Sequence, residues 1–335
     1  MNRVLHLDRT YDLHLSMMWH GYNVHEKRWN NHGISWHVYE IIDYYLLLRE
    51  YFKVGILLCE DIDWEILYNA IIYKYDIDDN IIDEIKQHTT FYNRPKIVRG
   101  KNILFVDGGL KRGGGEAPPL LVFNNIICFR CSIYDTHYDL PYSNLTLLQD
   151  NRVYDDDDNN IAIDYIKKIN FKYYKKIKNN VSRTGMLYIT NNCRLLTDQQ
   201  LLAIITKYDF DRFLILTSSP HAYAHRFRKY DNFEFPTLPV NNIFGKFNTH
   251  IYTRTRSDDE PNRSGSNLPF DCSPRFIAEC KYYDKDVIYD NIDDEYLNND
   301  TGLKYRKYDI DNDFSSLFLD EQDALIDIIK GKLDQ

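Results

Sequence analysis

The alternation of short apolar runs with amphipathic segments constrains this chain more than any other feature of its sequence. Residues 34–52 place apolar side chains at helical spacing, and the run VGILLC at 54–59 has the length and composition of a buried strand. The same order recurs later, where MLYIT at 186–190 and FLILT at 213–217 enclose a helical segment at 197–208. Strands that alternate with helices pair in parallel, because each helix returns the chain to the edge at which the preceding strand began. The pattern therefore predicts an α/β fold with a mostly parallel sheet.

Further segments in both halves follow the same alternation. Each expected strand is a short apolar run, and each expected helix repeats its apolar residues at intervals of three and four. One expected helix, over 161–177, carries five lysines. The other expected strands are 3–7, 95–98, 102–106, 120–128, 250–252 and 287–289, and the other expected helices are 63–73, 79–87 and 315–330.

The acidic run DDDDNN at 155–160 interrupts this alternation. A block of like charges stays in water, so we expect a loop between two domains here. A chain of 335 residues is long enough for two ordinary domains. We therefore expect an N-terminal Rossmann-like domain over 1–155 on the acceptor side and a C-terminal Rossmann-like, nucleotide-sugar-binding domain over 161–312. We expect the final segment, 313–335, to form a helix that packs back on the N-terminal domain.

Composition excludes several classes of protein. The formal net charge of −9 argues against a uniformly basic nucleic-acid surface. The sequence contains neither an apolar run long enough to span a membrane nor the apolar N-terminal stretch of a signal peptide. Six scattered cysteines, among them the lone pair Cys128 and Cys131, indicate reduced thiols rather than a zinc site. We therefore expect a cytoplasmic protein, in the host cytoplasm if the Ile-, Asn- and Lys-rich composition reflects an AT-rich viral genome.

Motifs of several common enzyme classes are absent. The chain has no Walker loop, no GxGxxG turn, no HExxH and no GxSxG motif. Asp-x-Asp occurs, for example at 61–63, 76–78 and 309–311, but a chain this rich in aspartate contains such triplets by chance. We therefore expect no donor site built on a carboxylate-held divalent cation.

Histidines are concentrated near the N-terminus. Four of them lie within eighteen residues, from His20 to His37. Their irregular spacing and the lack of an accompanying acidic pair argue against a zinc site. A histidine that faces a cleft can act as a general acid or base, because its proton exchanges near neutral pH. His20 and His37 are the candidates for that role.

The segment 271–289, DCSPRFIAECKYYDKDVIY, combines a loop, a helix and a strand. Ser273 and Pro274 suit the N-cap and the first helical position. A helix start beside parallel strands binds phosphate, since its free backbone N–H groups and its dipole point at the anion. Two carboxylates accompany this start, Asp271 just before the helix and Glu279 about two turns into it.

This segment resembles the donor site of GT-B glycosyltransferases, in which a loop, a helix with an acidic residue and a strand hold a nucleotide-sugar. A second resemblance covers 19–60, where Gly33 precedes a long helix and a strand, as the first glycine loop of GT-B folds does. The resemblance implies an α/β fold of two Rossmann-like domains that face each other across a cleft (GT-B). It also implies a glycosyltransferase that moves a sugar from a nucleoside diphosphate sugar, a UDP-sugar being the expected one. Neither a metal nor another cofactor is obligatory in this scheme.

The resemblance also implies roles for individual residues. Glu279 would accept hydrogen bonds from the ribose hydroxyls, and Gly33 would let the backbone approach the donor sugar. Asp271 stands where many retaining members have the first glutamate of a Glu-x7-Glu pattern, and its side chain is shorter. Arg194 and Ser218 follow the ends of expected strands. The expected donor-binding residues are Gly33, Arg194, Ser218, Ser273, Pro274, Arg275 and Glu279. The expected catalytic residues are His20, His37 and Asp271.

The acceptor stays open between two classes. The basic and aromatic stretches 171–178 and 221–230 suit nucleic-acid backbones and unstacked bases, which favours 5-hydroxymethylpyrimidines in DNA, as in phage-type DNA modification. The acidic net charge instead favours a cell-surface or small-molecule glycan. A third alternative is a non-catalytic binding protein that keeps the GT-B fold without turnover.

Overall fold

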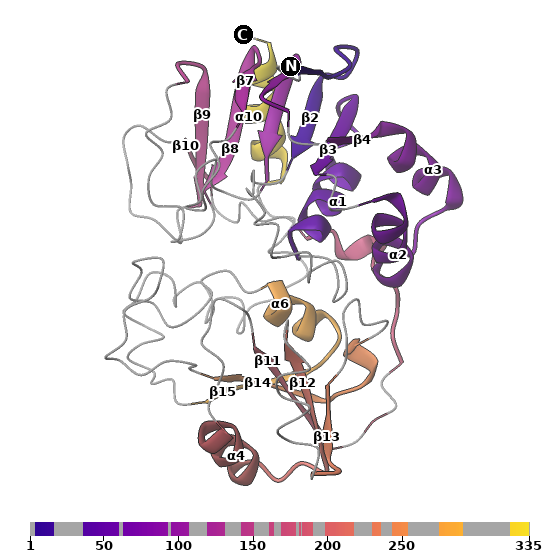
Figure 1. Ribbon diagram of the computed structural model, residues 1–335, viewed down its shortest axis with the longest axis vertical. Helices are drawn as coiled ribbons and strands as arrows, with labels where there is room; N and C mark the ends of the chain where they lie inside the picture. Colours follow the sequence, from indigo (N-terminus) through magenta and orange to yellow (C-terminus); the bar gives the residue numbers. More distant parts are fainter. Residues whose placement is uncertain are drawn as a thin grey trace. The chain divides into compact units, whose positions relative to one another are not determined.

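The computed structural model describes two compact units within this chain (Figure 1). Among the described residues, those up to Tyr174 and the C-terminal stretch 322–334 form unit 1, and those from Lys175 to Asp290 form unit 2. The described residues are 4–16, 36–59, 63–92, 95–106, 119–130, 142–150, 161–163, 169–178, 181, 183–189, 198–217, 230–235, 243–253, 275–290 and 322–334.

Unit 1 is built on a seven-stranded, fully parallel sheet in the order β10-β9-β8-β6-β2-β3-β4. The first of these strands in the chain, β2, lies inside the sheet. The next two strands add on one side of it and the following four on the other, which is the doubly wound arrangement. The strands are β2 (Leu13–Ser16), β3 (Val54–Cys59), β4 (Thr89–Tyr92), β6 (Asn102–Phe105), β8 (Asn125–Arg130), β9 (Leu145–Asp150) and β10 (Ile161–Ile163).

Helices cover one face of this sheet. α1 (Trp36–Leu48) connects β2 to β3, and every residue from Val38 to Leu48 is buried. The ring of Tyr44 on α1 lies 5.0 Å from that of Phe129 on β8, so α1 covers the face that carries Phe129. The other helices of unit 1 within the described residues are α2 (Trp64–Lys74), α3 (Asp79–His88) and α10 (Gln322–Leu333). α10 contacts the turn that follows α1, where Gln322 Nε2 donates to the Tyr51 hydroxyl over 3.4 Å.

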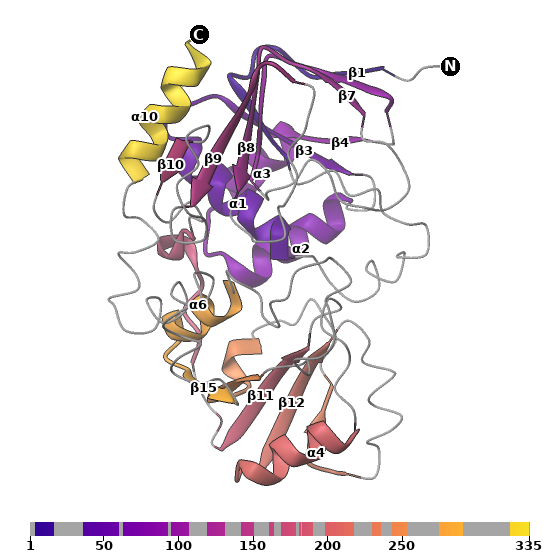
Figure 2. The same ribbon diagram turned by 90° about the vertical axis from the view of Figure 1, so that its left-hand side faces the viewer.

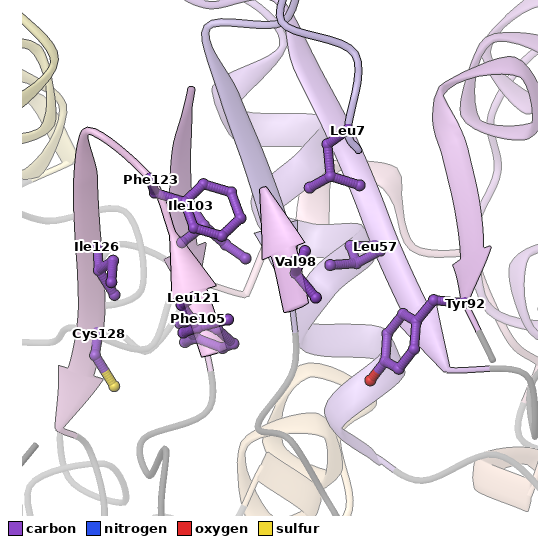
Figure 3. Packing of buried hydrophobic residues seen from close by; sticks show 10 residues of the cluster. All are labelled: Leu7, Leu57, Tyr92, Val98, Ile103, Phe105, Leu121, Phe123, Ile126 and Cys128. Atoms are coloured by element: carbon purple, nitrogen blue, oxygen red, sulfur yellow. The ribbon is translucent and has the colours of Figure 1, made fainter. Parts of the chain in front are cut away.

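A small three-stranded parallel sheet, ordered β1-β5-β7, lies against the opposite face (Figure 2). Its strands are β1 (Val4–His6), β5 (Ile97–Arg99) and β7 (Leu120–Val122). β5 continues after a two-residue bend into β6 of the large sheet, and β7 continues likewise into β8, while a turn of six residues connects β1 to β2. The corner between the two sheets holds an apolar core (Figure 3) formed by Leu7, Leu57, Tyr92, Val98, Ile103, Phe105, Leu121, Phe123, Ile126 and Cys128.

Unit 2 repeats the doubly wound arrangement on a smaller scale. Its five parallel strands are ordered β13-β12-β11-β14-β15. Ile251 on β14 packs with Leu201 and Ile204 of α4, while its neighbour His250 faces Phe276 of α6, so the two helices cover opposite faces. The elements are β11 (Thr184–Ile189), α4 (Asp198–Lys207), β12 (Arg212–Thr217), β13 (Phe233–Glu234), the 3-10 turn η4 (Ile243–Gly245), β14 (Thr249–Thr253), α6 (Arg275–Tyr282) and β15 (Asp286–Asp290). The expected α/β class with parallel sheets is therefore confirmed.

An asparagine joins the first and fourth strands in each unit, Asn102 buried in unit 1 and Asn248 half-buried in unit 2. In unit 1, Asn102 Nδ2 donates to the Asp12 carbonyl over 2.8 Å. In unit 2, Asn248 Nδ2 donates to the Val181 carbonyl over 2.8 Å, and its Oδ1 accepts the Thr184 N–H over 3.3 Å. Both asparagines stand at the start of the fourth strand, where they satisfy backbone groups that would otherwise lack partners at the sheet's end.

The expectation of a helix over 161–177 is wrong. Residues 161–163 form β10, which pairs with β9, and Phe171–Tyr173 form only a 3-10 turn, η3. Phe171 and Tyr174 are buried in unit 1, and this burial outweighs the helix propensity of Lys172 and of the other lysines in the segment. The described residues of 161–174 consequently belong to unit 1, and the chain enters unit 2 at Lys175. The expected single strand over 120–128 is also divided, into β7 and β8, by the bend at Phe123 and Asn124.

Gly100 lies in the bend between β5 and β6, where the packing requires a residue without a Cβ atom. A Cβ atom at this position would lie 2.5 Å from Cε1 of Phe123, whose ring belongs to the corner core. We expect Gly100→Ala to lower the free energy of unfolding by about 1–3 kcal/mol, as overpacking does. Gly331→Ala is the matched control, since a Cβ there meets nothing within 4 Å and alanine favours the helix by up to about 1 kcal/mol. Chemical denaturation followed by circular dichroism measures both, and equal stability of the two variants would contradict the prediction.

Candidate functional site

The sheet of unit 2 changes direction of winding between β11 and β14. From β11 the chain proceeds outward to β12 and β13, and it then returns to place β14 on the other side of β11. In doubly wound sheets, ligands bind outside the carboxyl ends of the strands at such a switch point, because the loops diverge there and leave a crevice. The carboxyl ends of β11 and β14, at Ile189 and Thr253, therefore mark the candidate site of unit 2.

α6 follows β14 in the chain and is anchored by aromatic packing. The Phe276 ring stacks on Phe244 at 5.1 Å and meets the edge of His250 at 5.0 Å. Ala278 and Cys280 on the same helix are buried as well. Because α6 connects the carboxyl end of β14 to the start of β15, its first residue, Arg275, opens the helix toward the candidate site.

The end of α6 is defined by its backbone. Asp284 adopts a left-handed φ of 52°. The N–H of Lys285 donates to the Cys280 carbonyl over 2.9 Å, and the N–H of Asp284 to the Lys281 carbonyl over 3.0 Å. This pair of bonds is the Schellman motif, which ends a helix by satisfying its last carbonyls. The last carbonyls of α6 are therefore satisfied at its C-terminus. The backbone N–H groups that have no partner within the helix lie at its N-terminus.

Glu279 lies in the interior of unit 2, with no exposed surface. A carboxylate in such a position is stable only when it receives hydrogen bonds or a paired charge. Burial, together with the neighbouring Glu279 carboxylate, raises the pKa of the Cys280 thiol well above its usual range. Cys280 is therefore a protonated, unreactive thiol.

Two buried histidines that the sequence analysis did not single out lie on strands where the strand order reverses. His14 lies on β2 in unit 1, and His250 lies on β14 in unit 2. His250 on β14 holds its Nδ1 3.2 Å from the Met186 carbonyl of β11, so Nδ1 carries the proton. His14 on β2 has Gly55 of β3 beside its ring, which leaves no room for a Cβ there. Burial lowers the pKa of each to about 4. Both are neutral parts of the sheet, and the short runs LHLS and THIYT in which they lie carry no signal that marks a buried histidine.

The sequence-predicted residues are described only in part. His37 lies in α1 of unit 1, and Arg275 and Glu279 lie one helical turn apart in α6 of unit 2. The remaining predicted residues, His20, Gly33, Arg194, Ser218, Asp271, Ser273 and Pro274, lie outside the described residues.

Within the described stretches, no three His, Cys, Asp or Glu side chains cluster closely enough to hold a metal ion. Of the helices described above, none has both the length and the hydropathy needed to cross a bilayer.

Comparison of the sequence with models of known protein families finds no match, and comparison with curated protein sequences finds none either. The fold and the chemistry of individual residues therefore carry the functional argument.

The two buried histidines predict a pH dependence of stability. Since folding lowers each pKa from 6.5 to about 4, the unfolded chain binds protons that the folded chain does not, and stability is lost as the pH falls through that window. Each histidine contributes a slope of up to ~1.4 kcal/mol per pH unit. Denaturant titrations between pH 7 and pH 4 should show a smaller slope for His14→Gln and for His250→Gln. An undiminished slope in both variants would contradict this assignment.

Proposed function

We propose that this protein is a glycosyltransferase of the GT-B type, in which unit 2 binds the nucleoside diphosphate sugar and unit 1 contributes the acceptor side. The observation that supports the proposal most directly is the switch point between β11 and β14, followed in the chain by α6. The helix start would bind the diphosphate through backbone N–H groups, with Arg275 as its first residue.

The loops that follow β11 and β12 in unit 2 favour a nucleoside diphosphate sugar over a dinucleotide as the ligand. A Rossmann dinucleotide site needs a glycine-rich turn after the first strand and an acidic residue after the second. Here β11 is followed by 190–197, TNNCRLLT, which lacks glycine, and β12 is followed by Ser218 and Ser219 rather than an acid. The phosphates would therefore be held at α6, after the fourth strand, instead of at α4, after the first.

Glu279 fits the ribose of the donor. The resemblance to GT-B donor sites assigns to this carboxylate of α6 the hydrogen bonds from the ribose hydroxyls. In the proposed reaction, the acceptor oxygen forms a bond to the anomeric carbon while the bond from that carbon to the diphosphate breaks. The acceptor proton passes to a base, for which His20 or His37 is the candidate, and the released diphosphate is stabilised by α6 and by arginines such as Arg194.

Donor binding tests this proposal. Thermal-shift measurements with UDP-, GDP- and ADP-sugars should show stabilisation by at least one of them, since a ligand of the folded state raises the unfolding temperature. Glu279→Ala should lower the affinity for that nucleotide by about tenfold to a hundredfold, because a hydrogen-bonded charge contributes about 1.5–3 kcal/mol. Isothermal calorimetry measures the change, and circular dichroism checks that the variant folds.

Glu234→Ala is the control for donor binding. Glu234 belongs to unit 2 but pairs with Arg212 over 2.8 Å at the surface, so its loss should leave the affinity unchanged. If none of the nucleotide-sugars stabilises the chain, or if Glu279→Ala binds as tightly as the unaltered protein, the proposal fails. Binding without sugar transfer or donor hydrolysis would support the non-catalytic alternative.

The acceptor is tested separately. For 5-hydroxymethylpyrimidine DNA, the affinity for duplex should fall steeply as salt rises, because each phosphate contact releases a counterion. The described part of the basic stretch gives limited support, since Lys172 is paired with Glu50 over 3.1 Å. Fluorescence anisotropy with modified and unmodified duplexes at several salt concentrations measures this. A flat salt dependence would exclude DNA and favour a glycan acceptor.

A further inference from the structure

The small sheet of unit 1 has two edges, and their backbone groups are bonded differently. β7 forms one edge and β1 forms the other, with β5 between them. An edge strand presents a row of N–H and C=O groups that can pair with another chain unless they are covered. Whether an edge is covered therefore decides whether a further strand can be added there.

Side chains cover the edge at β7. The N–H of Leu121 donates to the Tyr142 hydroxyl over 3.3 Å. Asn144 Nδ2 donates to the carbonyls of Phe123 and Asn124, over 2.8 and 3.0 Å. These bonds occupy backbone groups that a strand added beside β7 would need. This edge is therefore protected against further pairing.

The edge at β1 is open. The N–H of Leu7 donates to the Arg99 carbonyl, which follows the ladder between β1 and β5, over 2.7 Å. Because successive residues of a strand turn their backbone groups to alternate sides, Val4 and His6 face away from β5. Within the described part of the chain, no hydrogen bond reaches the N–H or the carbonyl of Val4 or His6. β1 therefore offers two donors and two acceptors at its outer edge.

The outer face of the small sheet is apolar beside this edge. The register of the three strands aligns Val4, Ile97 and Leu120 in one row, and Val122 lies in the next. Val4, Leu120 and Val122 are 38%, 53% and 41% exposed. A neighbouring strand with an apolar side chain beside Val4 would extend this row and remove part of it from water, which is favourable by about 25 cal/mol per Å².

The charge of the sheet indicates the chemistry of a partner. Arg99 lies beside His6 in the second row of the outer face and is exposed. Lys96 and Arg9, which adjoin the sheet in the sequence, are exposed as well. Asp8 is the one acidic residue between residues 4 and 9, and the sequences of β5 and β7 contain none. The sheet is therefore locally basic, although the chain carries a net charge of −9.

We propose that β1 is a docking edge for an extended, acidic peptide segment of a partner protein, which adds to the small sheet as a fourth strand. The backbone of the segment pairs with Val4 and His6, as in other cases of strand addition. An apolar side chain of the segment lies beside Val4, and an acidic side chain two residues along lies beside His6 and Arg99. This interaction does not depend on the proposed sugar transfer.

A second copy of this chain fits the edge less well than an acidic segment does. Pairing β1 with β1 of another copy would bring two basic stretches together, and like charges on adjacent strands destabilise the pairing. Light scattering of the full chain separates the two occupants. His6→Pro should leave the molar mass unchanged, whereas a dimer that this variant dissociates would overturn the proposal.

Synthetic peptides test the expected chemistry of the partner. The probe is Glu-Val-Val-Glu-Val-Val-Glu, because valine then lies beside Val4 and glutamate beside His6 in either direction of pairing. Fluorescence anisotropy with the full chain should show that this peptide binds at least about tenfold more tightly than Lys-Val-Val-Lys-Val-Val-Lys. Absence of binding, or equal affinity for the two peptides, would overturn the proposal.

His6→Pro tests the backbone of the edge. The N–H of His6 points away from β5, so proline removes a donor that the added strand needs without breaking the ladder to β5. The affinity for the glutamate peptide should fall by about fivefold to tenfold, as expected for one lost hydrogen bond. His6→Ala keeps that donor and should lose far less affinity. Circular dichroism checks that both variants fold, and equal affinity of the two would contradict strand addition.

Arg99→Glu tests the charge of the outer face. A glutamate here would place like charges on adjacent strands, so the affinity for the glutamate peptide should fall by about threefold to tenfold. Lys86→Glu is the matched control, because Lys86 is an exposed residue of α3 and makes the same change of charge outside the small sheet. An equal loss of affinity in both variants would show that the peptide does not bind at this sheet.

Amide hydrogen exchange of the unaltered chain locates the added strand. When the glutamate peptide saturates the protein, exchange of the His6 N–H should slow by at least about tenfold, because that group gains a partner. The N–H of Leu7 is already bonded to the Arg99 carbonyl and should change little. Nuclear magnetic resonance measures both rates. Unchanged exchange at His6 while the peptide is bound would overturn the assignment of the docking edge to β1.

Discussion

The pairing of the first strand with the fourth strand holds each unit together, because every crossover connection depends on it. In unit 1 this pair is β2 and β6, and in unit 2 it is β11 and β14. The chain arrives at the fourth strand only after two strands have been laid down on the other side, so this pairing closes the longest loops of the fold. Asn102 and Asn248 secure it at the amino ends of the strands. At the opposite, carboxyl ends, the connections from the two strands lead to opposite sides of the sheet, and doubly wound proteins bind ligands in the crevice between such connections.

Sequence patterns predicted the long periodic elements and several short strands, among them β1, β5, β6, β14 and β15, but other short strands were missed. The strand 54–59 and the helices near 36–48 and 198–207 agree closely with β3, α1 and α4, since each combines an apolar periodicity with clear end signals. β2 was missed because four residues that include a histidine carry too little signal. β10 was taken for the start of a helix, because only its neighbour β9 in the folded sheet shows that residues 161–163 are extended.

The candidate site could be located from the sequence only as far as its position along the chain. The strand–loop–helix–strand order around 271–289 matches the observed succession of β14, α6 and β15. The full burial of Glu279 depends on packing around α6 and cannot be read from a helical pattern. His250 was overlooked for a related reason: a polar residue on a buried strand is stabilised by one carbonyl of the neighbouring strand, and that carbonyl is not encoded near it in the chain.

In unit 1, strands of the small sheet continue into strands of the large sheet, so the registers of the two sheets are linked. Since β5 runs into β6 across only Gly100 and Lys101, the register of one sheet determines that of the other. A one-residue insertion within 97–105 would turn inward-facing side chains outward on one side of the insertion. The corner core would then lose Val98 or Ile103 together with their partners. This part of the chain should consequently tolerate changes of length far less readily than sequence changes, and its spacing should be preserved even where individual residues drift.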